Sequence, residues 1–276
     1  MADGARGQLR RFLFEHHPVR GHHVDLGAAW QELRAVHAYP IAVETLLGEA
    51  VAASVLLAAT LKFDGRLTLQ FTGHGAVSLL VAQCTHDFRI RAVAQHGDDV
   101  PPLADVATLV GDGRLAVTVE SGEQGGRYQG IVPLEGDGIA ACLETYFAGS
   151  EQLPTSLRLH ASGDRAAGVL LQRLRAISGT ALLLPSDQLL PQLCGELDCR
   201  LFAATPVTFH CGCGDGRVAQ MLRSLGEAEL RDIVREQGAV TVHCEFCRRV
   251  YRFDAIDVET LIAGRNTDNG PQPRPN

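Results

Sequence analysis

The sequence predicts an α+β protein with three parts: an N-terminal α+β core domain, a proline-broken linker and a small C-terminal module with four cysteines. Two patterns predict this fold class. Short segments with apolar residues at every second position alternate with longer stretches of helical apolar spacing. A chain of 276 residues is also longer than one average domain, so a core with an appended module is the expected organisation.

The composition is that of an ordinary globular protein, with 46% hydrophobic and 21% charged residues. The net charge of -7 argues against nucleic-acid binding through a general positive field, because phosphate neutralisation requires a basic surface. The N-terminus shows no apolar run of signal-peptide length, so we expect a cytoplasmic protein without a membrane partner.

Residues 1–175 are expected to form the core domain. Strands are predicted in RLTLQFTG, AVSLLVAQC and RLAVTVESGEQGGRYQGIVPL, where apolar residues alternate between glycine-rich breaks. Helices are predicted at Ile41–Leu61 and Ile139–Phe147. The first helical stretch is long enough to span a bilayer, but it contains Glu44 and Glu49, whose charges are costly at membrane depth. We therefore expect a buried amphipathic helix.

Residues 176–210 are expected to form a metastable linker. The segment has three prolines, short apolar runs and no clean period. Because proline removes a backbone donor and blocks helix continuation, this segment should pack on the core without a strong fold of its own. It contains Cys194 and Cys199, and we expect packing thiols there, as for Cys84 and Cys142 in the core, since free cysteine behaves as a small hydrophobe.

Residues 211–264 are expected to form a separate module of two helices, a β-hairpin and a final helix. GRVAQMLRSLG and EAELRDIVREQG have helical spacing, and each ends in a glycine suited to a left-handed cap. AVTVHC and RRVYRF alternate like the strands of a hairpin with its turn at EFC. DVETLIAG is predicted to be a helix with Asp257 as its N-cap, and residues 265–276 have the composition of a disordered tail.

The module carries two close cysteine pairs, Cys211 with Cys213 and Cys244 with Cys247. Two pairs of soft ligands separated by a small fold predict a tetrahedral zinc site, because each pair supplies two adjacent corners. Four thiolates leave no open position for water, so we expect neither a hydrolytic zinc centre nor an enzyme.

The residues alone leave two roles open for this site. Most four-cysteine zinc sites only stabilise a module that is too small to hold a core. The Cys-x-Cys pair favours a redox switch, because its sulfurs are neighbours once zinc leaves and the disulfide between them closes a strained, reducible ring. Thiolates held by a metal also react with oxidants.

The histidines are weaker candidates for a metal site. His210 and His243 flank the cysteines and could replace a ligand, but four cysteines are already available. The pairs at positions 16–17 and 22–23 are adjacent in sequence, and neighbouring residues do not share a face of a strand or helix. We expect these two pairs to be surface or capping residues.

Segments along the whole chain resemble those of a known family. They are RRFLFEHHPVRG, LLAATLKFDGRLTLQ, RYQGIVPLEGDGIAACLETYFAGSEQLPT, AAGVLLQ and CEFCRRVYRFDAIDVETL. On these segments, which stand in family order and reach to Gly264, the sequence resembles the 33 kDa chaperonin family, the redox-regulated heat-shock chaperones of bacteria.

The resemblance implies an ATP-independent holdase chaperone of the cytoplasm that acts under oxidative stress. In its reduced, inactive state the family binds one Zn²⁺ through the cysteines that match Cys211, Cys213, Cys244 and Cys247. Oxidation links Cys211 to Cys213 and Cys244 to Cys247, zinc leaves, and the module and linker unfold. The exposed apolar surface binds unfolding client proteins, and the oxidised form tends to dimerise.

The sequence departs from the family in its linker, which is shorter than in many members and contains the two additional cysteines. Two other functions are alternatives to a redox-regulated chaperone. One is a constitutively folded zinc-ribbon adaptor without a redox switch, which zinc release on mild oxidation would exclude. The other is a thiol-disulfide oxidoreductase that uses CEFC, but thioredoxin-like pairs begin a helix after a strand, whereas CEFC is predicted at a hairpin turn.

Overall fold

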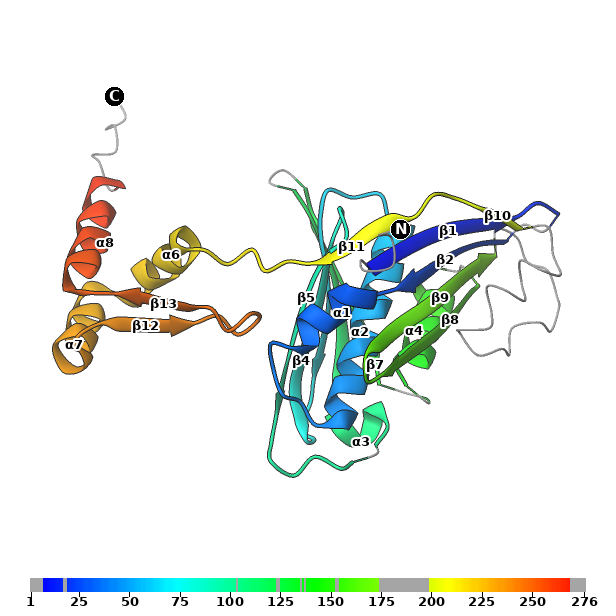
Figure 1. Ribbon diagram of the computed structural model, residues 1–276, viewed down its shortest axis with the longest axis horizontal. Helices are drawn as coiled ribbons and strands as arrows, with labels where there is room; N and C mark the ends of the chain where they lie inside the picture. The colour runs from blue at the N-terminus through cyan, green and yellow to red at the C-terminus, as the bar shows by residue number, and fades with distance from the viewer. Residues whose placement is uncertain are drawn as a thin grey trace. The chain divides into compact units, whose positions relative to one another are not determined.

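The computed structural model describes residues 7–16, 19–102, 104–122, 125–134, 136, 138–151, 154–173 and 199–268. The chain divides into two compact units, Met1–His210 and Cys211–Asn276, and most of their elements carry labels in Figure 1. The first unit contains a large sheet together with several helices, and the second contains helices and a β-hairpin. The predicted α+β fold class is confirmed.

One sheet of eleven strands forms the frame of the N-terminal unit within the described residues. Its strand order is β7-β6-β3-β4-β5-β11-β1-β2-β9-β8, with β10 beside β1. Only β11 and β5 run parallel, and the other neighbours are antiparallel. The strands are β1 Gly7–Phe14, β2 Val19–Asp25, β3 Gly65–Thr72, β4 Val77–Thr85, β5 Arg89–His96, β6 Arg114–Ser121, β7 Arg127–Pro133, β8 Thr155–Ser162, β9 Arg165–Arg173, β10 Cys199–Leu201 and β11 Thr205–Phe209.

The strands predicted from alternating apolar residues are present. In β3, for example, Leu67, Leu69 and Phe71 are fully buried while the residues between them are more exposed, as expected for a strand with one face on the core. The helices of this unit follow the predicted stretches and add short ones. They are α1 Gly27–Arg34, α2 Ile41–Thr60, α3 Val106–Val110, α4 Ile139–Tyr146 and the π-helical turn η1 Phe147–Glu151.

Helix α2 is the centre of the core. It contacts strands from both ends of the sheet's strand order, including β3, β4 and β5 on one side and β2, β8 and β9 on the other (Figure 1). It is long and apolar enough to cross a membrane, but 78% of its most apolar window is buried inside the fold. The predicted amphipathic pattern is therefore wrong, because a helix enclosed by a sheet is apolar on nearly every side.

The two glutamates of α2 lie at its less enclosed positions. Glu44, in the first turn, pairs with Arg34 of α1 at 3.0 Å. Glu49 is largely buried, and this burial raises its pKa to about 7, because the charged form loses hydration. The helix thus accommodates both carboxyl groups without facing a membrane.

The end of the predicted linker belongs to the sheet. Residues 174–198 lie outside the described part of the chain, but β10 pairs with β1, and β11 lies between β1 and β5. β10 and β11 therefore pack on the core, as expected for residues 176–210, but they do so as strands of its sheet, which the sequence did not predict. Pro206 and the short strand length concealed the pattern, because proline usually marks an edge strand or a loop.

The cysteines outside the module are packing residues where the structure describes them. Cys84 and Cys142 are buried in the main core, as predicted. Cys199 of β10 packs against a small cluster on the outer face of β1 and β9 that includes Phe12 and Leu171. Cys194 lies outside the described residues.

The histidine pair of β2 was placed incorrectly by the sequence analysis. His22 and His23 lie on opposite faces of the strand, as neighbours must, but His22 is only 6% exposed. Burial first, and then the charges of Arg11 and Arg20, lower its pKa to about 4. His22 is therefore a neutral core residue and not a surface or capping residue.

The C-terminal unit has the predicted order of two helices, a hairpin and a final helix. Its apolar core is small, with Leu222, Leu230, Tyr251 and Val258 among its buried members. Such a small core is a weak basis for stability on its own. The elements are α6 Asp215–Leu225, α7 Glu227–Gln237, β12 Val240–His243, β13 Val250–Phe253 and α8 Ala255–Asp268.

The ends of these helices differ in detail from the prediction. Gly238 caps α7 in the left-handed conformation, as predicted, whereas Gly226 after α6 has φ 107° and ψ 150° because it also begins α7. The N-cap of α8 is Asp254, whose carboxylate accepts hydrogen bonds from the amides of Ile256 and Asp257, both at 2.9 Å. The Asp254 amide in turn donates to the Asp257 carboxylate at 3.1 Å, so Asp257 is the partner in a capping box and not the N-cap.

Helix α8 also continues beyond its predicted end at Gly264. It runs to Asp268, so the first residues of the predicted tail 265–276 are helical, and residues 269–276 lie outside the described part.

Candidate metal centre

The four cysteines of the C-terminal unit form one cluster. Cys211 and Cys213 precede α6, whereas Cys244 and Cys247 lie on the turn that joins β12 and β13. The four sulfur atoms all lie within 4.8 Å of one another. Two contacts join one pair to the other, with 3.6 Å between the sulfurs of Cys211 and Cys244 and 3.3 Å between those of Cys213 and Cys247.

The hairpin turn holds its two cysteines through backbone hydrogen bonds. The amide of Cys244 donates to the carbonyl of Arg249 at 2.9 Å, and the amide of Arg248 donates back to the carbonyl of Cys244 at 2.8 Å. Arg248 has φ 58°, a left-handed conformation that reverses the chain within this short loop. The turn therefore directs both sulfurs to one side.

The Cys-x-Cys segment is fixed by the start of α6. Gly214 is the N-cap, and its carbonyl accepts hydrogen bonds from the amides of Arg217 and Val218, both at 3.0 Å. Gly212, between the cysteines, lies against Arg217, since a Cβ there would be 3.2 Å from that guanidinium. The small residue thus lets the arginine approach the sulfur cluster.

The donor set fits a tetrahedral metal ion. Sulfurs bound at about 2.3 Å in a regular tetrahedron lie about 3.8 Å apart, close to the spacing of this cluster. None of the four cysteines is in a disulfide. These residues could hold a metal ion, and four thiolates would leave no coordination position open to water or substrate.

The four thiols differ in their electrostatic environment. Burial would raise the pKa of Cys213, but the nearby Tyr251 hydroxyl and the other thiols favour the thiolate more strongly and lower this pKa to about 7. Burial raises the pKa of Cys247 to about 12, and it also raises the pKa of Cys211. The site therefore has one thiol that readily carries negative charge.

Tyr251 and Arg249 stand beside that thiol. The buried Tyr251 hydroxyl has no partner of ordinary hydrogen-bond geometry among the described residues. Its interaction with Cys213 nevertheless raises the pKa of Tyr251 to about 12. The pKa of Arg249 is raised by Tyr251 and by the negative charges of Cys213 and Cys247. A phenol and a cation are thus placed to offset the charge of a metal bound by thiolates.

The four ligand candidates were predicted from the cysteine spacing, whereas Tyr251 was not. The available signal was the alternation of RRVYRF, which turns this tyrosine toward the module's interior. His210 and His243 are not members of the cluster. CEFC lies on the hairpin turn and not at a helix start, as predicted.

The chain matches known proteins along most of its length. The family model described as Hsp33 protein matches residues 7–254. A "33 kDa chaperonin" of Nitrosococcus oceani is 44% identical over 275 residues, with 93% of this chain and 94% of the relative covered. Another of Pseudomonas aeruginosa is 40% identical over 292 residues, with 97% and 98% covered. A crystal structure of the 33 kDa chaperonin of Thermotoga maritima matches with a TM-score of 0.80 and 25% identity, over 95% of this chain and 99% of that one.

Proposed function

The chain belongs to the Hsp33 family, and we propose that it is an ATP-independent holdase that oxidation switches on by displacing zinc from Cys211, Cys213, Cys244 and Cys247. A chaperone function follows from the family, whose members carry a non-enzymatic name. The observation that supports the switch is the single cluster of four thiols, all within 4.8 Å of one another. We place its action in the bacterial cytoplasm.

Zinc suits this cluster best among the common metals. Four thiolates in a compact, closed arrangement favour a soft or borderline ion with no need for open positions. One Zn²⁺ bound by the reduced cysteines would supply folding free energy on the order of 10 kcal/mol. That is large beside what the small core of residues 211–264 contributes by itself.

Oxidation removes the ligands from the metal. When a peroxide oxidises Cys211 and Cys213, two thiolates lose two electrons and form one S–S bond. If the oxidant is hydrogen peroxide, its O–O bond breaks, it takes up the two electrons and two protons, and two water molecules form. The same reaction joins Cys244 to Cys247. A disulfide sulfur is a poor metal ligand, so both reactions favour zinc release.

Loss of the metal would then unfold part of the chain. The module 211–264 would lose its main source of stability, and the linker 176–210 adjoins it directly. The linker would open in stages, because its last strands, β10 and β11, pair with the core sheet. Apolar side chains released in this way would bind unfolding clients and would also favour dimers of the oxidised form.

Aggregation of a thermally unfolding protein tests the proposal. Only the oxidised, zinc-free chain should suppress light scattering by the client, and the reduced chain should not. If both forms suppress it equally, the cluster is a permanent structural site of the adaptor type, and the switch is refuted.

A further inference from the structure

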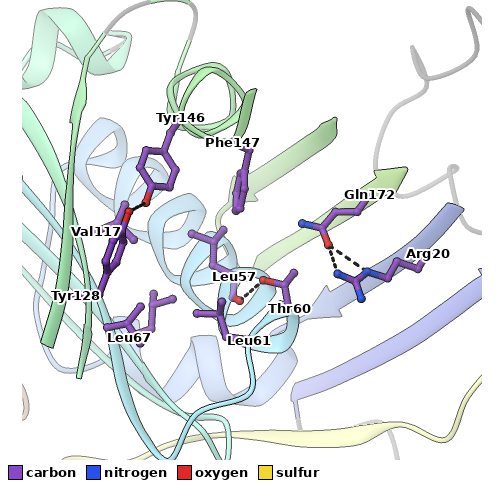
Figure 2. A pocket seen from close by; sticks show the side chains of 11 residues that line it. Arg20, Leu57, Thr60, Leu61, Leu67, Val117, Tyr128, Tyr146, Phe147 and Gln172 are labelled. Atoms are coloured by element: carbon purple, nitrogen blue, oxygen red, sulfur yellow. Dashed lines mark hydrogen bonds between the residues drawn. The ribbon is translucent and has the colours of Figure 1, made fainter. Parts of the chain in front are cut away.

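A cavity of about 300 Å³ lies in the N-terminal unit beside the C-terminal end of α2 (Figure 2). This volume is within the range of small-molecule sites and is on the order of ten water molecules. The cavity belongs to a different unit from the cysteine cluster, and none of the sequence motifs discussed above accounts for it.

Most of the cavity wall is apolar. Leu57 and Leu61 come from the end of α2, and Val117 and Val119 come from β6. Phe147 closes the wall next to α4. An aliphatic chain of about ten carbons would fill such a space and remove both its own surface and that of the wall from water.

Arg20 supplies a cation at one side of this apolar cavity. In Figure 2 its guanidinium lies beside Gln172, apart from the two tyrosines on the opposite side. The Nε and Nη2 atoms of Arg20 donate to the Gln172 side-chain oxygen at 3.2 and 2.9 Å. Gln172 is only 1% exposed and reaches Thr155 through its amide nitrogen at 3.5 Å, so the arginine is held by a fixed partner.

The charge of Arg20 is not neutralised within the described residues. Its partner Gln172 is neutral, and no described carboxylate forms an ion pair with it. Arg11 and His22 lie on the same face of β1 and β2 as Arg20, and the pKa of His22 is lowered first by burial and then by the charges of both arginines. This face is therefore locally positive in a chain whose net charge is -7.

Two backbone carbonyls near the end of α2 already accept hydrogen bonds from the chain itself. The hydroxyl of Thr60 donates to the Leu57 carbonyl at 2.8 Å, and the amide of Leu61 donates to the Ala58 carbonyl at 3.2 Å. On the far side, the hydroxyls of Tyr128 and Tyr146 bond to each other at 2.8 Å. The Nη1 and Nη2 end of Arg20 is consequently the donor group best placed to bind an anion, and two N–H groups side by side match the two oxygens of a carboxylate.

We propose that this cavity binds a small amphipathic carboxylate, with its aliphatic chain between α2 and β6 and its carboxylate on Arg20. The site is independent of the cysteines and of the proposed redox function. The expected ligand is a medium-chain fatty acid. Its single negative charge would pair with Arg20, and its chain, which has no polar groups, would contact the apolar wall.

Titration calorimetry of the full reduced chain with decanoate, kept below its micelle concentration, tests this site. We expect one saturable site with a sub-millimolar dissociation constant. Arg20→Met should weaken binding about tenfold or more, whereas Arg20→Lys, which keeps the charge, should weaken it less. Arg114→Met removes the same charge from an exposed position at the other end of β6 and should leave binding unchanged.

Two further measurements separate the carboxylate from the chain. Decanol should bind wild type and Arg20→Met equally, because it lacks the charge that Arg20 recognises. Val119→Phe should weaken the binding of decanoate, because the larger side chain fills part of the cavity. The emission of the buried Trp30 verifies that each variant is folded. No saturable decanoate binding to wild type, or equal binding to wild type and folded Arg20→Met, would overturn the proposal.

Discussion

The sulfur of Cys213 lies 3.3 Å from that of Cys247, a member of the other cysteine pair. Cys211 and Cys244 make the equivalent contact at 3.6 Å. The folded module therefore holds one cluster of four sulfurs and not two separate dithiols. Which disulfides form on oxidation depends on whether the module is folded when the second bond closes.

We predict that oxidation at a temperature that loosens the module gives disulfides within each motif, Cys211 to Cys213 and Cys244 to Cys247. In an unfolded chain the cross-motif bonds would close a much longer loop, at an extra cost on the order of 2 kcal/mol. Strain in the small Cys-x-Cys ring acts against this advantage. Peptide mapping by mass spectrometry identifies the pairs, and a majority of cross-motif bonds would contradict the prediction.

Removing one ligand should unfold the module and spare the core. We expect Cys244→Ser to lose its zinc and to lose hydrogen-exchange protection in α6, α7 and α8, while β3 and β4 stay protected. Cys84→Ala is the matched control, because this buried thiol belongs to the other unit. Protected module amides in a zinc-free Cys244→Ser variant would show that the metal is not what stabilises the module.

Glu49 should make the core less stable as pH rises. Its pKa is raised to about 7 by burial, so the folded state retains a proton that the unfolded state loses near its ordinary pKa. The stabilisation is complete below about pH 4.5 and is lost as pH rises through about 7, by up to about 3 kcal/mol. Glu49→Gln should therefore gain stability over wild type between pH 5 and pH 8.

Urea unfolding followed by the emission of Trp30, the single tryptophan, measures that gain in the N-terminal unit. His22 and His23 act in the opposite direction, because their pKa values are lowered to about 4 and their protonation favours the unfolded chain below about pH 6.5. Wild type and Glu49→Gln carry the same histidines, so the difference between their free energies of unfolding reports on Glu49 alone. A difference that does not change with pH would show that this carboxyl group is not desolvated.

Gly21 should not tolerate a side chain. It stands opposite Phe12 on the neighbouring strand, and a Cβ at position 21 would overlap the fully buried Phe12 ring. We expect Gly21→Ala to lower the free energy of unfolding by about 1–3 kcal/mol through overpacking. Gly97→Ala, where a Cβ meets nothing within 4 Å, should change it by less than about 0.5 kcal/mol. Equal urea midpoints for the two variants would contradict this account.

The sequence was most informative where structure is set by local periodicity. Helix α4 and the hairpin of β12 and β13 were predicted from their regular apolar spacing, and α6 and α7 from the same spacing together with a glycine at the end of each. The strands β10 and β11 were not, because each is short and is defined by its partners in the sheet. The enclosure of α2 and the burial of His22 likewise depend on how distant strands curve around the helix.

The same division applies to the sites. Cysteine spacing alone predicted the four-sulfur cluster, since each pair is local and the small module brings the pairs together. The place of Tyr251 beside Cys213 required the register of the hairpin. The cavity beside Arg20 combines β2, β6, β9 and α2, and no local pattern could bring those segments together.

The most direct test follows zinc release and client protection in one sample. The reduced, zinc-loaded chain is treated with peroxide at mild heat, a chromogenic chelator records free zinc, and portions taken over time are added to a thermally unfolding client. We predict that suppression of light scattering rises in proportion to the zinc released and is reversed by a thiol reductant with zinc restored. Full suppression of light scattering before any zinc is released would contradict the proposed switch. So would a lack of suppression after all of the zinc has been released.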